Sequence, residues 1–184
     1  MDAARTRPAL TIRPERPQDR EAISQVHQLA FGQPNEALLV EALRRAPAFI
    51  PELSLVALDA TQVVGHILFS RIAVRTPSDA RPALALAPMA VLPAFQRRGI
   101  GSGLVKRGLA DARSLGHGLV IVVGHPDYYP RFGFVRAEPF GIRAPFEVSG
   151  EAFMVLELQA SALQGCRGEV VYPPQFAQAD GSRG

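Results

Sequence analysis

The chain has 184 residues, of which 47% are hydrophobic and 20% are charged. These proportions are typical of one globular domain with its own core, and they exclude a disordered chain. The longest apolar run, Leu119–Val123, is far below the roughly 20 residues that a membrane-spanning helix needs. The formal net charge of +3 is mildly basic, and basic side chains do not gather beside aromatic ones, so we expect no nucleic-acid partner.

The amino terminus carries Arg5 and Arg7 without a following apolar stretch, so we expect no signal peptide. Cys166 is the single cysteine, which excludes an internal disulfide and a cysteine-built metal cluster. We therefore expect no metal and no membrane partner, and a reducing cytoplasm as the location.

No internal repeat and no Ser/Gly linker divides the chain, which indicates a single domain over residues 10–160. Residues 1–9 have no apolar period, so we expect them to be flexible. The extension over residues 161–184 is expected to be partly disordered, because its end from residue 175 onward is small and polar and we expect it to fray.

Hydrophobic spacing predicts the elements of the first half of the domain. A strand over residues 10–13 precedes a helix over 17–31, whose first turn tolerates Pro17 because that amide lacks a helical partner. A second helix spans 35–45, with Asn35 as its predicted cap. The other elements of this half are strands over 53–58, 63–74 and 83–92.

The second half alternates strands with helices. A strand leads through a glycine-containing turn into a helix that ends at Gly116, as a left-handed glycine cap would end it. The run Leu119–Val123 is typical of a buried strand in a parallel sheet, and strand, helix and strand at this spacing indicate a right-handed crossover. A short helix over 127–132 follows, then strands from Phe134 and over 153–158. The fold class is therefore α/β.

The turn before the long helix of this half reads Gln96-Arg97-Arg98-Gly99-Ile100-Gly101. Glycines let a ligand approach the backbone closely, and the first N–H groups of a helix lie at the positive end of its dipole. We therefore expect the amides between residues 98 and 102 to bind a pyrophosphate, with Arg97 and Arg98 adding positive charge.

Two other phosphate-binding motifs do not fit this turn. The ATPase loop requires G-x-x-x-x-G-K-[ST], which the chain lacks. The dinucleotide fingerprint requires a third glycine where Leu104 stands and an acidic residue near position 119, where there is none. The pattern that remains is Q-x-x-G-x-G.

This pattern, together with the preceding Met89-Ala90-Val91-Leu92-Pro93, resembles the acyl-CoA signature of the GNAT N-acetyltransferases. The similarity extends through a second element, from Gly124 to Phe134, in which a tyrosine, three residues and Gly-Phe follow one another. That element and the late segment from Gly168 to Tyr172 resemble one bacterial subgroup of predicted N-acetyltransferases. The resemblance covers the chain from about Ile12 to about Leu158.

The resemblance implies a mixed, mostly antiparallel sheet with two splayed parallel strands and helices on both faces. It implies that acetyl-CoA is the acyl donor and lays its pantetheine arm between the strands over 87–92 and 119–124. It also implies direct transfer of the acetyl group to a primary amine in a ternary complex. The cofactor-binding residues that it indicates are Met89, Ala90, Val91, Gln96, Arg97, Arg98, Gly99, Ile100, Gly101, Ser102, Tyr128 and Phe132.

One local feature agrees with this arrangement without the resemblance. Pro88 lies inside the strand that precedes the turn, and proline cannot donate to a strand ladder. Pairing is therefore interrupted by a bulge there, or the strand lies at an edge of the sheet. An interruption would leave backbone groups at residues 89–91 free to pair with the amides of pantetheine.

In the family, the tyrosine four residues before the glycine of Gly-Phe protonates or hydrogen-bonds the CoA sulfur, and this role falls on Tyr129. Tyr128 is the adjacent alternative, and a shift of one helical residue turns a side chain by about 100°. The candidate bases that would deprotonate the acceptor are Glu36, His66, His125 and Asp127. Deprotonation through water, with no single base, is an equal alternative.

Several alternatives stay open at this stage. A non-catalytic acyl-CoA-binding or regulatory module would keep the turn and lose turnover. The acceptor is either a small molecule or a protein amino group, and a homodimer is compatible with the sequence. We expect Arg131 and Arg136 to be solvated charges and Cys166 to be a buried small hydrophobic residue.

Overall fold

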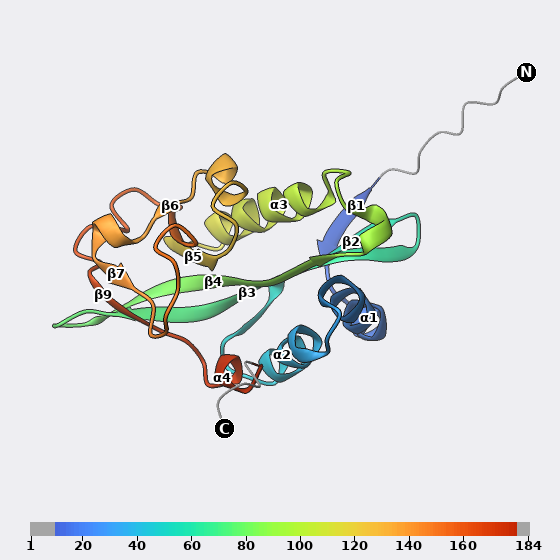
Figure 1. The fold of residues 1–184 in the computed structure, drawn as a ribbon, viewed down its shortest axis with the longest axis horizontal. Coiled ribbons are helices and arrows are strands. Elements are labelled where there is room, and N and C mark those ends of the chain that lie inside the picture. Colours follow the sequence, from blue (N-terminus) through green and yellow to red (C-terminus); the bar gives the residue numbers. More distant parts are fainter. Residues whose placement is uncertain (1–9, 180–184) are drawn as a thin grey trace, which may run out of the picture.

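The computed structural model describes residues 10–179, in which nine strands form one mixed sheet with helices on both faces (Figure 1). The strands are β1 (Thr11–Pro14), β2 (Phe49–Asp59), β3 (Gln62–Arg75), β4 (Ala80–Val91), β5 (Leu119–Val123), β6 (Val135–Arg136), β7 (Ile142–Arg143), β8 (Phe153–Glu157) and β9 (Gly168–Val171). The helices are α1 (Arg20–Phe31), α2 (Asn35–Arg44), α3 (Ile100–Ser114) and α4 (Gln175–Ala179). Short 3-10 helices are η1 (Pro17–Asp19), η2 (Pro93–Phe95), η3 (Tyr129–Phe132) and η4 (Glu138–Phe140).

The strand order is β1-β2-β3-β4-β5-β8-β6, and β9 pairs with both β3 and β7. Most pairs are antiparallel; β4 with β5 and β7 with β9 are the parallel pairs within residues 10–179. This architecture confirms the predicted mixed, mostly antiparallel sheet. None of the helices in this part of the chain is long and apolar enough to cross a membrane.

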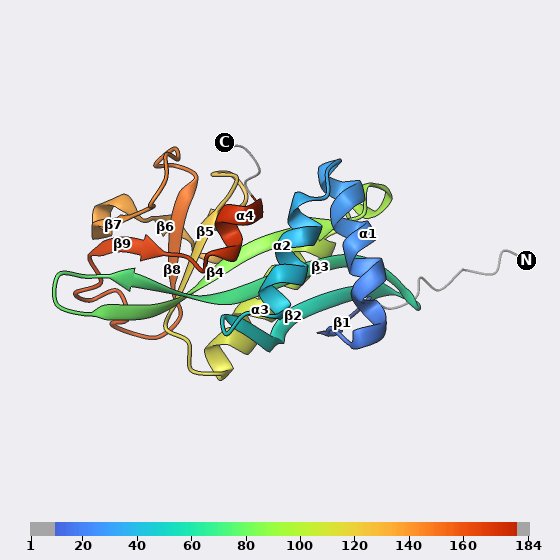
Figure 2. The ribbon, with the colours of Figure 1, turned by 90° about the horizontal axis from the view of Figure 1, so that it is seen from below.

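The helices divide between the two faces of the sheet, with α1, α2 and α4 on one face and α3 on the other (Figure 2). Side chains of β2, β3 and β4 alternate between these faces, as successive strand residues must. Thus Ile67 and Phe69 contact the α3 side, whereas Leu68 packs with α1 and α2. The sheet therefore separates two hydrophobic layers, one on each of its faces.

Strand β4 leaves its parallel neighbour early. The pairing of β4 with β5 covers Leu84 with Val120 and Ala85 with Ile121, and it stops there. Opposite this point, the register of β3 against β4 shifts between Ile67 and Phe69. The interruption predicted from Pro88 is confirmed, and the edge-strand alternative is wrong, because β4 lies between β3 and β5.

The boundaries of α3 follow the glycines on either side of it. Gly99, at φ 82°, is the residue before the helix, and Gly116, at φ 87°, follows its last turn, so both adopt the left-handed conformation that favours glycine. The predicted cap of α2 is wrong. Asn35 is already the first helical residue, and Pro34 occupies the capping position. The side chain of proline can neither donate nor accept a hydrogen bond.

The late elements that were not predicted from the sequence are η4, β7, β9 and α4. The end of the chain was expected to fray from residue 175, but residues 175–179 form α4, and Phe176 packs against the two hydrophobic clusters on the α1 and α2 face. Strand β9 was missed because four residues carry too little periodicity, and its partners β3 and β7 are distant in sequence. The expected flexible residues 1–9, and residues 180–184, lie outside the described residues.

A glycine inside α3 tests the packing between this helix and the sheet. A side chain at Gly108 would overlap the ring of Phe69, which is fully buried on β3. We expect Gly108→Val to lower the free energy of unfolding by about 2 kcal/mol, because an overpacked core must displace its neighbours. The matched control is Ala110→Val on the exposed side of the same helix, which should cost less than about 1 kcal/mol. Equal losses in urea denaturation would contradict this account of the interface.

Candidate functional site

The turn between β4 and α3 is held by its own side chains. The Gln96 Nε2 group donates a hydrogen bond to the backbone oxygen of Val91 at 3.0 Å, which fastens the turn to the end of β4. The guanidinium of Arg98 lies over the ring of Phe95, 5.0 Å from its centroid. Arg97 adopts φ 58°. Gln96, predicted as a cofactor-binding residue, therefore has a structural role in shaping the turn.

The first turn of α3 leaves its backbone donors free. The first helical bond runs from the Gly103 amide to the Gly99 oxygen at 2.9 Å, and no side chain caps the helix within the described residues. The amides of residues 100–102 precede that bond, so helix geometry gives them no internal partner. A Cβ at Gly99 would meet nothing within 4 Å. This arrangement of free donors beside open space suits an anion, and a diphosphate fits it.

Tyr128 lies beside this helix start. Its hydroxyl is 3.0 Å from the position that a Cβ of Gly101 would take, and side-chain carbons of Met89 and Val91 are each 3.8 Å from the same point. The end of β4, the start of α3 and the segment before η3 therefore meet around Gly101. The structure brings these predicted residues together, as the sequence analysis expected.

Tyr129 is buried next to Tyr128. Only 6% of it is exposed, and a side chain at Gly124 would overlap its ring. Its ring meets those of Tyr128 and Phe134 edge-on, at centroid distances of 5.1 and 5.6 Å. The pKa of Tyr129 is raised well above its ordinary value, mainly by burial and to a smaller extent by the charge of the neighbouring Tyr128. The hydroxyl of Tyr129 therefore carries its proton at neutral pH.

The other predicted cofactor residues contribute in different ways. The side chains of Ala90 and Ile100 are buried, in different hydrophobic clusters, so only their backbone groups are available to a ligand. Ser102 is half-buried in the first turn of α3. Phe132 is half-buried and packs against the cluster that contains Tyr129.

The two late arginines differ from each other. Arg136 is exposed and pairs with exposed Glu138 at 2.7 Å, as expected of a solvated charge. Arg131 is also exposed, but its guanidinium lies over the ring of Tyr128 at 4.4 Å, and its Nε donates to the Tyr128 oxygen at 3.1 Å. Arg131 is therefore exposed, as expected, but it also contacts Tyr128. Nothing in the sequence pattern indicated this stacking.

The candidate bases are placed unevenly. Glu36 is half-buried at the start of α2, where its carboxylate accepts a hydrogen bond from Gln33 at 3.1 Å. His125 and Asp127 are exposed in the segment that leads into η3, and the backbone oxygen of His125 accepts the Tyr128 amide at 3.0 Å. His66 is fully buried on β3, on the face covered by α1 and α2.

His66 belongs to a chain of hydrogen bonds. Its Nδ1 lies 2.9 Å from Nε2 of His27, and its Nε2 lies 2.9 Å from Oγ of Ser54. The Ser54 hydroxyl donates to Glu15 at 2.6 Å, and Arg44 donates twice to the same carboxylate, at 2.6 and 3.0 Å. With both ring nitrogens engaged and no exposed surface, His66 is removed from the candidate bases.

The carboxylate fixes the direction of every proton in this chain. Burial raises the pKa of Glu15, but hydrogen bonds from His66, Arg44 and Ser54 outweigh it and leave that pKa at about 2. Glu15 therefore has no proton to donate, so Ser54 must donate to it and can only accept from His66. His66 then carries its proton on Nε2, and Nδ1 accepts from His27. The Nδ1 of His27 is left buried and without a partner among the described residues.

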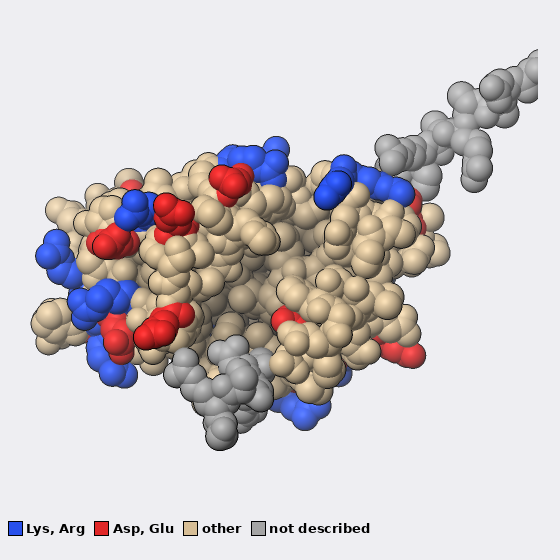
Figure 3. Space-filling view, viewed as in Figure 1, with Lys and Arg blue, Asp and Glu red and all other residues tan. Residues whose placement is uncertain are grey.

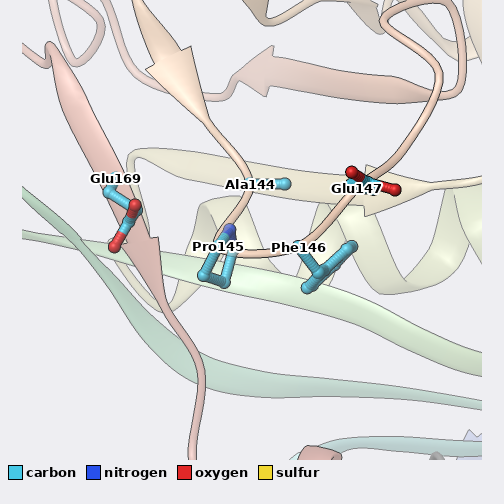
Figure 4. Close-up of a pocket in the computed structure, with 5 residues that line it drawn as sticks. All are labelled: Ala144, Pro145, Phe146, Glu147 and Glu169. Carbon is cyan, nitrogen blue, oxygen red and sulfur yellow. The ribbon is translucent and has the colours of Figure 1, made fainter.

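One pocket on the surface lies away from this site. This pocket of about 570 Å³ is lined by Ala144, Pro145, Phe146, Glu147 and Glu169 (Figure 4). Glu169 on β9 is paired with Arg75, at the end of β3 that adjoins the beginning of β4, whereas Met89 is near the other end of β4. The space-filling view shows a hollow near the middle of this face, with basic side chains and one acidic group above it (Figure 3).

Comparison with known families agrees with this geometry. Residues 11–137 match the profile of the acetyltransferase (GNAT) domain. The chain belongs to the GNAT family. Among GNAT proteins, it is 39% identical to the uncharacterized N-acetyltransferase YjhQ of Escherichia coli, over 72% of this chain and 74% of YjhQ. It is 33% identical to the uncharacterized N-acetyltransferase YhbS of the same species, over 91% of this chain and 98% of YhbS.

Solved GNAT structures share the fold over almost the whole chain. The crystal structure of YhbS from Escherichia coli in complex with CoA aligns with a TM-score of 0.85 and 32% identity, over 94% of this chain and 95% of that one. A GNAT acetyltransferase from Brucella melitensis in complex with acetyl-CoA aligns with a TM-score of 0.75 and 34% identity, over 91% and 98% of the two chains. The resemblance and the fold expected from the sequence are both confirmed.

The buried histidines predict how stability depends on pH. The pKa of His27 is lowered to about 2, mainly by burial and to a smaller extent by the charges of His66 and Arg44. Burial also lowers the pKa of His66, although the hydrogen bond and charge of Glu15 partly offset this effect. Unfolding restores the ordinary pKa of about 6.5, so the unfolded chain binds protons first as the pH falls. The stabilisation is therefore complete above about pH 6.5 and is lost progressively below it.

We expect the free energy of unfolding to fall by about 2 kcal/mol between pH 7 and pH 5 on account of His27, and His66 acts in the same direction. The low pKa of Glu15 causes a loss of stability only below about pH 4.5. Between pH 7 and pH 5, the change in stability therefore does not include this carboxylate. In urea titrations, His27→Phe should reduce the loss, while His125→Ala on the surface should not. An unchanged pH slope in His27→Phe would contradict the neutral, buried state of this imidazole.

Proposed function

We propose that the chain transfers the acetyl group of acetyl-CoA directly to a primary amine while both are bound. The observation that carries this proposal is the set of unpartnered amides at the head of α3, beside the point where β4 leaves β5. The complexes of the two related GNAT proteins with CoA and acetyl-CoA support it.

In this proposal, the diphosphate of CoA accepts hydrogen bonds from the amides of residues 98–102. The pantetheine arm follows β4 over residues 89–91, where β5 no longer satisfies the backbone groups of that strand. The open space at Gly99 and the missing side chain at Gly101 let the ligand reach the helix start. Arg97 and Arg98 are exposed beside it and add positive charge.

The chemistry needs few protein groups, because a thioester is already activated. The acceptor ammonium loses one proton, and its nitrogen attacks the carbonyl carbon. The carbon–sulfur bond breaks, the sulfur leaves with the electron pair, and the nitrogen releases its second proton to solvent to give the neutral amide. Water, Glu36, His125 or Asp127 receives the ammonium proton. Holding donor and acceptor together provides the largest share of the acceleration.

Tyr129 stabilises the leaving sulfur in this scheme. A thiol has an ordinary pKa of about 8.5, and the pKa of Tyr129 is raised well above that of a free tyrosine. A full proton transfer from Tyr129 to the thiolate is therefore unfavourable at equilibrium. Tyr129 acts instead as a hydrogen-bond donor to the developing thiolate, and solvent completes the protonation.

The cofactor site is tested by placing a branched side chain at the helix start. We expect Gly99→Val to weaken CoA binding at least about 100-fold, because valine would enter the space assigned to the diphosphate. Gly116→Val is the matched control, since Gly116 has nearly the same positive φ at the other end of α3. Backbone strain is then common to both variants. Equal calorimetric affinities of the two variants for CoA would sink the assignment.

The role of Tyr129 is tested by removing its hydroxyl alone. We expect Tyr129→Phe to lower kcat for thiol release from acetyl-CoA by roughly 10- to 100-fold, with CoA affinity almost unchanged. Tyr128→Phe is the comparison, and it should change CoA affinity more than kcat, because its hydroxyl lies beside Gly101. CoA binding without thiol release for any amine of a broad panel would favour a non-catalytic acyl-CoA sensor.

A further inference from the structure

Arg131 is held in a fixed position without an acidic partner. Its Nε donates to the Tyr128 oxygen at 3.1 Å, and its guanidinium lies 4.4 Å from the centroid of the Tyr128 ring and 5.6 Å from that of Phe132. Within residues 10–179, its two Nη groups make no hydrogen bond, and no carboxylate lies within ion-pair distance. The stacking fixes the guanidinium plane while leaving its outer donors free.

Tyr128 connects this cation to the head of α3. The edge of its ring that carries the hydroxyl reaches the first turn of the helix at Gly101, 3.0 Å from the Cβ position. Its face carries the guanidinium of Arg131. One aromatic ring therefore separates the unpartnered amides from an unpaired, oriented cation. The guanidinium of Arg98 also lies over an aromatic ring, that of Phe95. Two arginines near the start of α3 are therefore stacked on aromatic side chains.

Such an arrangement has a specific chemical use. A guanidinium matches two phosphate oxygens with two parallel N–H donors, and a stacked one loses little freedom on binding. The amides of α3 supply donors from one side only. A second donor group beyond Tyr128 would complete the coordination of a diphosphate.

We propose that Arg131 binds the diphosphate of CoA, together with the amides of residues 98–102 and with Tyr128 between them. This inference rests on the proposed function. Arg131 lies two residues after Tyr129 in the same short helix, η3. Contact with the diphosphate therefore also fixes the helix that carries the hydroxyl donor, so binding of the donor positions Tyr129 for the transfer.

The experiment is calorimetric titration of wild type and Arg131→Gln with CoA, 3′-dephospho-CoA and pantetheine. We expect Arg131→Gln to bind CoA and 3′-dephospho-CoA about tenfold more weakly, by equal factors, and pantetheine without change. Arg136→Gln is the matched control, because that arginine is exposed and already paired with Glu138. Arg131→Lys should recover only part of the affinity, since it keeps the charge without the planar donors.

Each other outcome overturns the proposal in a distinct way. A loss for CoA but not for 3′-dephospho-CoA would assign Arg131 to the 3′-phosphate. A loss that includes pantetheine would mean that Arg131 acts by holding Tyr128 in place. Equal binding by Arg131→Gln and wild type would remove Arg131 from the site. Failure of wild type to bind CoA at all would refute the proposed function itself.

Discussion

The site depends on the separation of β4 from β5. These strands pair at two positions, and beyond Ala85 no strand within residues 10–179 pairs with β4 on that side. Buried backbone groups without partners are unfavourable, so a strand left open in this way invites a ligand that carries its own amides. The end of β4 leads through η2 to the start of α3, where the amides of the first turn are also free.

A second set of interactions holds the opposite face in place. Four side chains from different elements form one chain of hydrogen bonds: His27 of α1, His66 of β3, Ser54 of β2 and Glu15, which follows β1. Burying a polar group is costly unless it is hydrogen-bonded, so the bond between His27 and His66 favours one position of α1 on the sheet. His66 is also the direct partner of Ala90 in the ladder between β3 and β4. The network therefore supports the strand that the proposed donor follows.

Much of this arrangement could be predicted from local pattern. Residues 96–101 and 128–134 showed which segments meet at the site, because glycine positions and spacing are properties of the sequence alone. The stacking of Arg131 on Tyr128 and the bonds of His66 could not be predicted, since they depend on side chains meeting across elements. Strand β9 could not be predicted either, because its four residues carry too little periodicity and its partners β3 and β7 are distant in sequence.

The acetyl donor and the amine acceptor of the proposed reaction differ in how much support the family match gives them. The residues proposed to hold the donor lie between 89 and 132, within the segment 11–137 that matches the acetyltransferase domain. The late elements β7, β8, β9 and α4 lie outside that segment, and α4 packs beside α2 on the face opposite α3. Family membership therefore supports acetyl-CoA as the donor, whereas a shared fold does not fix the amine.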